Sequence, residues 1–391
     1  MTKKNVLFCI ENYKHGGIPK ALESLFANID HNKLNLHIFC INQEKGPYKK
    51  TLQKYVVNKQ NKWLWAFSTY YTEHNGFVVL WLLLLKAIRK VLIKLIGTDL
   101  FYRELDKEAK SLSVDSYDVV VAYSEGTVTR FVSKIECKKR IAWVHIDYKR
   151  NLRYIKNADE TEFYKQYNQI VIPSRFSRES FKEVFPFLSE RAVAIPNLLD
   201  EESIRKMAVY GNDLDERFVT KGFIILSVGR ICYEKQFFKI PEIASQLKKY
   251  GHSFRWYIIG GGAEEEVNFM KENVRKEAVE DVVILLGAKN NPYPYIKQSN
   301  VVVCTSLSET FSYVIGEAKV LGVPVVANNF GSVREVLNDE QGVICSIDNM
   351  APVINKLITD VSAYTRLKDN LKNYSYDNKS ALSKIYDLLL N

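Results

Sequence analysis

The sequence lacks several features that would point to a secreted, disulfide-bonded or membrane-spanning protein. Its six cysteines are scattered without C-x-x-C spacing, which favours small buried side chains in a reducing compartment. The N-terminal segment MTKKNVLFCIEN predicts a strand after two lysines, because its apolar run is too short for a signal peptide. The uncharged apolar run at residues 77–85 has nine residues, too few to span a bilayer. These absences favour a cytoplasmic protein.

Other missing motifs exclude whole classes of activity. The glycine run at 260–262 fails the G-x-G-x-x-G pattern, so nothing supports a dinucleotide cofactor. A hydrolase triad of Ser124, His145 and Asp147 has no G-x-S-x-G motif around its serine. No RNA-recognition, zinc-finger or helix-turn-helix signature is present, which argues against nucleic acid as a partner.

Charge and composition are informative about domains and partners. A length of 391 residues with 47% hydrophobic residues is enough for two domains, each with its own core. The net charge of +10 is uneven, because the first 197 residues carry +12 and the remainder carries −2. The basic half is therefore expected to face an anionic partner such as a membrane surface or a lipid phosphate.

The stretch at 301–337 predicts a strand, a polar loop, a helix and a second strand. In open α/β sheets, ligands bind where such a loop leaves the carboxyl end of a strand and enters a helix. Two carboxylates, Glu309 and Glu317, lie eight residues apart and could face one crevice if the helix begins near Thr310. The alternative is a capping residue at 308 or 309 and a solvated Glu317.

Two further strand–loop segments carry groups suited to phosphate. Gly16 and Gly17 follow an apolar strand and precede Pro19, which suits the first turn of a helix. Downstream, Arg230 and Lys235 follow the strand predicted at 223–228 and can place two positive charges on a diphosphate. An ordinary turn and a solvated pair of cations are the alternatives.

A basic amphipathic helix is predicted over residues 77–96. Four basic residues fall at three- and four-residue spacing, mostly on one predicted face, opposite Ile88, Leu92 and Leu95; they are Lys86, Arg89, Lys90 and Lys94. Together with the nearby tryptophans Trp63 and Trp65, this pattern favours contact with a membrane interface. A core helix with a solvated basic stripe remains the alternative.

The segment from Glu309 to Glu317, followed by AKVLGVPVVANNFGSVREV, resembles the E-x7-E signature of retaining family 4 glycosyltransferases, the glycosyl transferases group 1. Other segments match the family pattern in the same order: the Gly-Gly loop, S-E-G at 124–126, W-x-H-x-D at 143–147, V-G-R with E-K at 228–235, and NPYPYIK at 291–297. One departure is Gln236, which stands where the family usually has glycine.

This resemblance implies an α/β protein of GT-B fold, with two Rossmann-like domains that face each other across a cleft. Residues 1–197 would form an acceptor-binding domain, on which a C-terminal helix within 372–391 packs back. Residues 198–371 would bind the nucleotide-sugar donor.

The resemblance also implies roles for individual residues. The catalytic group would comprise Glu309, Arg230, Lys235 and His145. The donor would be bound by Gly16, Gly17, Gly229, Thr310, Phe311, Ser312 and Glu317. Glu125 and Asp147 would lie on the acceptor side, and His145 and Glu125 are the candidates for a catalytic base. Neither a metal ion nor a cofactor is expected.

The implied activity is retaining transfer of a hexose or N-acetylhexosamine in capsule or surface-polysaccharide assembly of the bacterial type. The donor would be a UDP-sugar, with GDP as the alternative nucleotide, and the acceptor a lipid-linked or free saccharide. The enzyme would sit at the inner face of the cell membrane, in peripheral contact through residues 77–96. A catalytically inactive GT-B partner subunit and a nucleotide-sugar epimerase are the competing interpretations.

Overall fold

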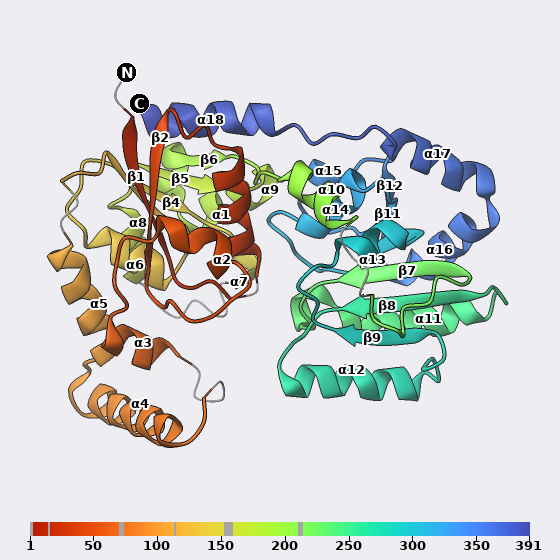
Figure 1. Cartoon of the computed structure of the whole chain (residues 1–391), viewed down its shortest axis with the longest axis horizontal. Helices are drawn as coiled ribbons and strands as arrows, with labels where there is room; N and C mark the ends of the chain where they lie inside the picture. The colour runs from red at the N-terminus through yellow and green to blue at the C-terminus, as the bar shows by residue number, and fades with distance from the viewer. Residues whose placement is uncertain (1–2, 15, 70–73, 113–114, 152–158, 210–213) are drawn as a thin grey trace. The chain divides into compact units, whose positions relative to one another are not determined.

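A computed structural model describes residues 3–14, 16–69, 74–112, 115–151, 159–209 and 214–391. The chain forms two compact units (Figure 1). The first comprises residues 1–173, 178–198 and 379–391, and the second comprises 174–177 and 199–378. Each unit contains a six-stranded sheet whose described strand pairs are all parallel. Parallel sheets are covered by helices on both faces, which explains why their strands read as almost unbroken apolar runs.

The sheet of the first unit has the strand order β2-β1-β3-β4-β5-β6. Its strands are β1 (Lys4–Ile10), β2 (Leu34–Cys40), β3 (Val119–Ala122), β4 (Arg140–Trp143), β5 (Gln169–Ile172) and β6 (Ala192–Ala194). Its helices are α1 (Gly17–Asn28), α2 (Lys49–Leu52), α3 (Lys62–Ser68), α4 (Phe77–Ile96), α5 (Leu100–Ser111), α6 (Thr127–Ser133), α7 (Tyr148–Asn151), α8 (Asp159–Tyr164) and most of α9 (Arg175–Val184).

The C-terminal helix α18 (Asn378–Leu390) packs on this first unit (Figure 1). The backbone N–H of Asp30 donates to the Tyr386 hydroxyl at 2.6 Å, and Lys139 Nζ donates to the Leu388 carbonyl at 2.8 Å. The Lys33 ammonium lies 4.8 Å from the centre of the Tyr386 ring. Polar and cation–π contacts therefore hold the end of the chain against the segments that directly precede β2 and β4.

The sheet of the second unit has the strand order β12-β11-β10-β7-β8-β9. Its strands are β7 (Phe223–Val228), β8 (Phe254–Ile259), β9 (Val283–Gly287), β10 (Val301–Cys304), β11 (Val325–Asn328) and β12 (Gly342–Cys345). Its helices are α10 (Glu201–Met207), α11 (Ile240–Lys248), α12 (Glu264–Lys276), α13 (Tyr293–Gln298), α14 (Tyr313–Val320), α15 (Val333–Val336), α16 (Met350–Thr359) and α17 (Val361–Leu371).

Both strand orders reverse direction beside the first strand of the unit. In the second unit, the chain runs outward from β7 through β8 and β9, then returns to add β10 on the other side of β7. In the first unit, β2 and β3 lie on opposite sides of β1. Loops at the carboxyl ends of two such strands lead away from each other and leave a crevice between them, which is where open α/β sheets bind ligands.

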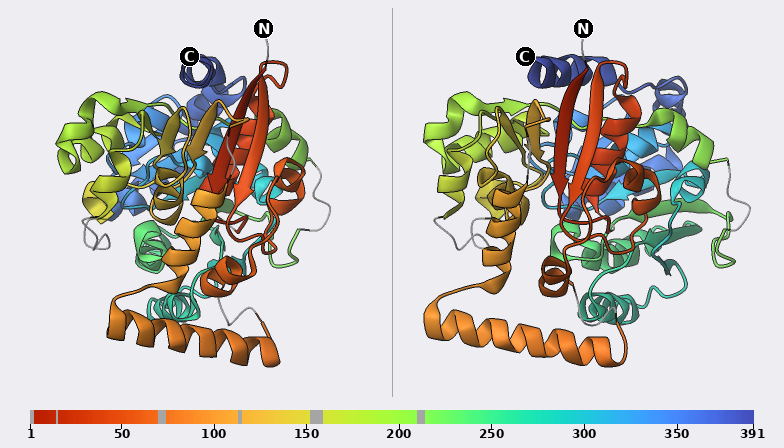
Figure 2. Two further views of the ribbon diagram at one scale, coloured as in Figure 1. Left: turned by 90° about the vertical axis from the view of Figure 1, so that its left-hand side faces the viewer. Right: turned by 60° about the vertical axis from the view of Figure 1, so that its left-hand side comes forward.

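Helix α4 is exposed along most of its length and lies at the edge of the first unit (Figure 2). Of its apolar side chains only Leu82 is fully buried, whereas eleven large ones are exposed: Phe77, Val78, Leu80, Trp81, Leu83, Leu84, Ile88, Val91, Ile93, Leu95 and Ile96. Within the described parts of the chain, no helix is both long and apolar enough to cross a membrane.

The charge pattern predicted for α4 was partly wrong. Lys86 Nζ donates to the Thr69 carbonyl at 2.7 Å, and the Arg89 guanidinium pairs with Asp99. These two cations therefore face the protein, and the outward face is apolar with only Lys90 and Lys94 as its basic residues. Spacing alone did not reveal this, because Asp99 lies beyond the helix.

Candidate active site

The loop between β10 and α14 holds Glu309 in a defined position. Ser306 Oγ donates to Glu309 Oε1 at 2.7 Å, and Lys235 Nζ forms an ion pair with the same oxygen. Ser332 Oγ donates to the Glu309 backbone carbonyl at 2.6 Å. The Glu309 side chain is only 13% exposed to solvent. The carboxylate is thus oriented by a hydroxyl and an ammonium before any ligand arrives.

Lys235 comes from the loop after β7, the strand adjacent to β10. Thr305 Oγ1 donates to the Lys235 carbonyl at 2.6 Å, and the Leu307 N–H donates to the Glu234 carbonyl at 2.8 Å. These bonds join the two loops at the point where the strand order reverses. Burial lowers the pKa of the Lys235 ammonium, but the Glu309 carboxylate outweighs this effect and the pKa ends above its usual value. Lys235 is therefore a cation at neutral pH.

Gln236 adopts a left-handed backbone conformation, with φ 53° and ψ 30°. It ends the short 3₁₀ turn Tyr233–Lys235 and turns the chain into the next helix. This conformation costs a residue with a side chain about 1–2 kcal/mol and costs glycine little. The family's preference for glycine at this position therefore has a backbone reason, and the glutamine meets the same requirement at a cost.

Glycines allow the loops after β7 and β8 to pack backbone against backbone. A Cβ on Gly260 would lie 1.7 Å from the Gly229 carbonyl oxygen, and one on Gly262 would lie 2.3 Å from that of Ile231. The Ile231 N–H donates to the Gly261 carbonyl at 2.8 Å. The role of Gly260 and Gly262 is thus to let these two loops pack closely. Arg230 lies in this packed loop with its side chain exposed and makes no hydrogen bond or ion pair with a described residue.

Helix α14 begins at Tyr313, three residues later than predicted. The segment Thr310, Phe311 and Ser312 is therefore loop, with Ser312 as the N-cap residue. The N–H groups in the first turn of a helix have no partner within that helix, and the positive end of the helix dipole lies there. These features suit the oxygen atoms of a sugar or phosphate.

Glu317 lies inside α14 and is 1% exposed, so the interpretation of a solvated surface glutamate was wrong. The Tyr293 hydroxyl donates to its Oε1 at 3.3 Å. Tyr293 is the first residue of α13, within the NPYPYIK segment. The two members of the E-x7-E pair thus have different partners: Lys235 and Ser306 for Glu309, and Tyr293 for Glu317.

In the first unit, Gly16 and Gly17 lie where β1 leads into α1. Gly17 is the first residue of the helix, and Gly16 is its N-cap residue. A Cβ added to either glycine would meet no atom within 4 Å. Packing among the described residues therefore does not require glycine at either position.

His145 and Glu125 follow the neighbouring strands β4 and β3 and are in contact. The His145 backbone N–H donates to Glu125 Oε2 at 3.0 Å. Burial lowers the pKa of the His145 imidazole to about 3, so the ring is neutral at physiological pH. Burial also raises the pKa of Glu125, and the hydrogen bond from His145 only partly offsets that increase.

Asp147 is directed into the first unit. Its Oδ1 accepts hydrogen bonds from Ser180 Oγ and, at 3.4 Å, from the Arg150 N–H. The residue is 8% exposed and precedes α7. These contacts fit a side chain that caps the short helix and ties it to α9.

Sequence reasoning missed the residues that orient the predicted ones. Ser306, Thr305 and Ser332 hold the loops around Glu309 and Lys235, and Tyr293 holds Glu317. The sequence could have indicated Ser306 and Thr305 as site residues, because both follow the buried strand β10. It contains no comparable indication for Ser332, which is distant in sequence from its partner Glu309.

Comparison with known families gives a match within the second unit. The family described as glycosyl transferases group 1 matches residues 213–377. The match lies within the second unit and covers less than half of the chain. Anabaena HepE in its complex with UDP-glucose superposes with a TM-score of 0.70 at 17% identity, over 99% of both chains. The whole chain therefore has the GT-B fold.

Sequence relatives carry the name glycosyltransferase. The chain is 26% identical over 189 residues to an uncharacterized glycosyltransferase of Methanocaldococcus jannaschii, covering 48% of this chain and 46% of that protein. It is 24% identical over 279 residues, 71% of each chain, to the Campylobacter jejuni N-acetylgalactosamine-N,N'-diacetylbacillosaminyl-diphospho-undecaprenol 4-alpha-N-acetylgalactosaminyltransferase. The chain thus spans about half the length of the first relative and more than two thirds of the second.

Proposed function

We propose that this protein is a retaining, metal-independent glycosyltransferase of surface-polysaccharide assembly. It transfers a hexose or N-acetylhexosamine from a UDP-sugar to a lipid-linked or saccharide acceptor. The observation that carries the proposal is the Lys235–Glu309 pair, which joins the loops after β7 and β10 at the reversal of the sheet. The UDP-glucose complex of HepE and the lipid-diphosphate acceptor in the name of the Campylobacter relative support the choice of substrates.

The donor would be held by groups of the second unit. Lys235 and the exposed Arg230 supply positive charge to the diphosphate, which stabilises the leaving group as its bond to the sugar breaks. Glu309 accepts hydrogen bonds from sugar hydroxyls, and Glu317 accepts them from the ribose. Thr310, Phe311 and Ser312 line the sugar site through their backbone, which continues into the N-terminus of α14.

Groups of the first unit would contact phosphate and serve the acceptor. Gly16 and Gly17 leave open space at the start of α1, which lets a diphosphate approach the backbone. The neutral His145 ring can both donate and accept a hydrogen bond from a hydroxyl. Glu125, with its raised pKa, takes up a proton more readily than an ordinary carboxylate.

Contact with an anionic membrane at the cytoplasmic face would bring the enzyme to a lipid-linked acceptor. The support is helix α4, because monomeric proteins rarely leave so many large apolar side chains exposed on one element. Lys90 and Lys94 lie on this outward face and can reach lipid headgroups while the apolar side chains enter the interface.

A donor panel tests the proposal. UDP- and GDP-sugars are added one at a time in the presence of EDTA, and thermal shift, nucleotide release and the anomeric configuration of the product are measured. We expect one UDP-sugar to stabilise the protein and to be turned over with retention. Glu309→Gln should abolish turnover, whereas Glu340→Gln, an exposed carboxylate in the same unit, should not. The absence of any shift or turnover would favour the inactive scaffold and refute the proposal.

A further inference from the structure

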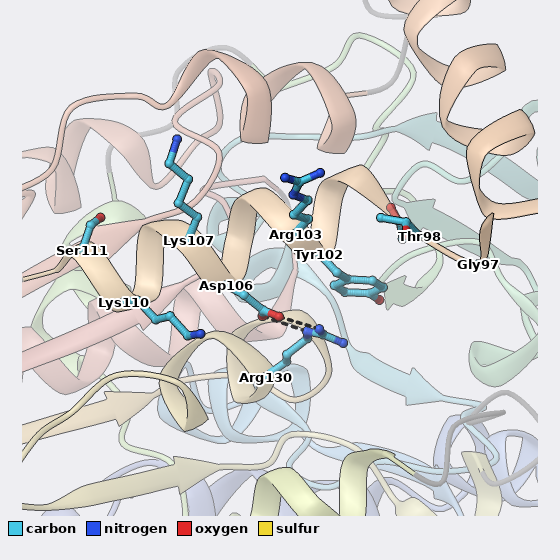
Figure 3. Close-up of a pocket in the computed structure, with 10 residues that line it drawn as sticks. Gly97, Thr98, Tyr102, Arg103, Asp106, Lys107, Lys110, Ser111 and Arg130 are labelled. Atoms are coloured by element: carbon cyan, nitrogen blue, oxygen red, sulfur yellow. Dashed lines mark hydrogen bonds and ion pairs between the residues drawn. The ribbon is translucent and has the colours of Figure 1, made fainter.

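An open cavity of about 830 Å³ lies on the first unit where α4 ends and α5 begins. Gly97 and Thr98 form its edge beside α4, and one side of α5 forms most of its wall (Figure 3). Arg130, from the middle of helix α6, also lines the cavity. None of the groups proposed to bind the donor or acceptor lines this cavity.

Both carboxylates in the cavity are already neutralised by arginines. Asp99 accepts two hydrogen bonds from the Arg89 guanidinium, at 2.7 Å each. Asp106 accepts two from Arg130, at 3.1 and 2.7 Å, as Figure 3 shows. Bidentate pairs of this kind have a fixed geometry and satisfy the oxygen atoms of the carboxylate. They therefore do not neutralise the remaining cations of the cavity.

Those remaining cations are Arg103, Lys107 and Lys110, all exposed. None of them makes a side-chain hydrogen bond or ion pair with a described residue. Arg103 and Lys107 are four residues apart and point to the same side of α5 in Figure 3, while Lys110 points toward Asp106 and Arg130. The cavity consequently has a surplus of positive charge, with a guanidinium and an ammonium side by side. This combination suits the oxygen atoms of a phosphate.

The position of the cavity beside the apolar end of α4 favours a lipid headgroup as the source of that phosphate. Leu95 and Ile96, the last residues of α4, are 73% and 65% exposed and directly precede Gly97 at the edge of the cavity. Both views of Figure 2 show α5 rising from the end of α4 toward the rest of the unit. A lipid with acyl chains beside the apolar end of α4 would therefore place its headgroup at the N-terminal part of α5.

We propose that this cavity binds the headgroup phosphate of an anionic membrane lipid, with Arg103 and Lys107 as its principal ligands. The site rests on the membrane contact included in the proposed function. It adds lipid selectivity to that contact: the apolar face of α4 inserts into any bilayer, and the cavity retains the protein on an anionic one. Helix α4 would thus provide non-specific insertion, and the cavity would provide recognition of the headgroup.

The test is flotation with two kinds of vesicle, one of phosphatidylcholine alone and one with about a third of phosphatidylglycerol. The informative variant is Arg103→Gln/Lys107→Gln. The matched control is Lys271→Gln/Arg275→Gln, which removes one lysine and one arginine at the same spacing from the exposed side of α12 in the other unit. Melting temperatures and donor-induced thermal shifts are measured on the same samples.

We expect the cavity variant to bind anionic vesicles roughly 20- to 30-fold more weakly than the wild type, because each basic residue near an anionic surface strengthens binding about fivefold. Its binding to phosphatidylcholine vesicles should not change. The control variant should bind both vesicles like the wild type. Leu84→Glu/Leu95→Glu, which places charge on the outward face of α4, should lose binding to both.

Three results would overturn the proposal. Equal loss of binding in the cavity and control variants would indicate a response to net charge alone. Unchanged binding of the cavity variant would exclude the site. Release of the wild type from anionic vesicles by millimolar inorganic phosphate would indicate a site for free phosphate. A protein that floats as expected but shows no shift with any donor would refute the proposed function while leaving the headgroup site intact.

Discussion

Replacing Lys235 by methionine separates the structural contribution of the Lys235–Glu309 pair from its catalytic one. The substitution keeps a long side chain and removes the charge. Glu309 then retains Ser306 as a hydrogen-bond donor but loses its cation. The side chains are 24% and 13% exposed, between a surface pair and a buried one. Surface pairs contribute up to about 1 kcal/mol, and loss of one partner of a fully buried pair costs about 3–5 kcal/mol. We therefore expect the free energy of unfolding to fall by about 2 kcal/mol.

The double variant Lys235→Met/Glu309→Gln decides between the two roles. Removing both charges leaves no uncompensated carboxylate, so about half of the lost stability or more should return. Activity should not return with it. If Lys235 stabilises the departing diphosphate, kcat/KM should stay about 10²- to 10³-fold below that of the wild type in the single and double variants alike.

The measurements are urea unfolding and donor turnover on the wild type, both single variants and the double variant. Stability is expected to show coupling between the two positions, and activity is expected to show no rescue. Recovery of turnover in parallel with stability would mean that Lys235 serves only to hold Glu309. Near-wild-type turnover in Lys235→Met would refute a role in leaving-group stabilisation altogether.

Three further predictions concern single positions. Gly17→Ala should keep or slightly raise the melting temperature, because the added Cβ meets no atom within 4 Å. If a diphosphate occupies that space, the same variant should lower kcat/KM on the order of 10²-fold. Unchanged turnover would contradict a diphosphate at this position. Gln236→Gly should have a free energy of unfolding in urea about 1 kcal/mol higher than Gln236→Ala. Both variants remove the side chain, but only glycine adopts the left-handed backbone conformation without strain. Equal stabilities would show that the strain is absent. Burial lowers the pKa of Lys319, a buried residue of α14, to about 8. Between this value and the higher pKa of Lys319 in the unfolded chain, the unfolded chain binds more protons than the native protein. The free energy of unfolding of the wild type should therefore rise by about 2 kcal/mol between about pH 8 and pH 10 relative to Lys319→Met, and parallel pH profiles of the two proteins would exclude this effect.

Local patterns were sufficient to predict the elements that carry the site. The apolar runs that became β7 and β10 are short and bounded by glycine and polar residues, so their carboxyl ends could be located within about two residues. The predicted start of α14 was three residues early, because Ser312 and the residues before it are as compatible with a first turn as with a loop. The loops after these strands could be recognised as candidate site loops, because parallel sheets place their ligand-binding loops at one end.

The sequence by itself determined the fold class, the family resemblance and the residues at the strand ends, because apolar periodicity and loop composition are local properties. Only the tertiary structure decided which of those residues meet. Lys235 and Glu309 are 74 positions apart and come together because β7 and β10 are adjacent in the sheet. Likewise, Arg89 faces inward because Asp99 lies beside it, leaving an apolar outer face on α4. The strength of an ion pair depends on the distance between the two charges in space. Strand order and helix packing determine that distance, whereas spacing along the chain does not.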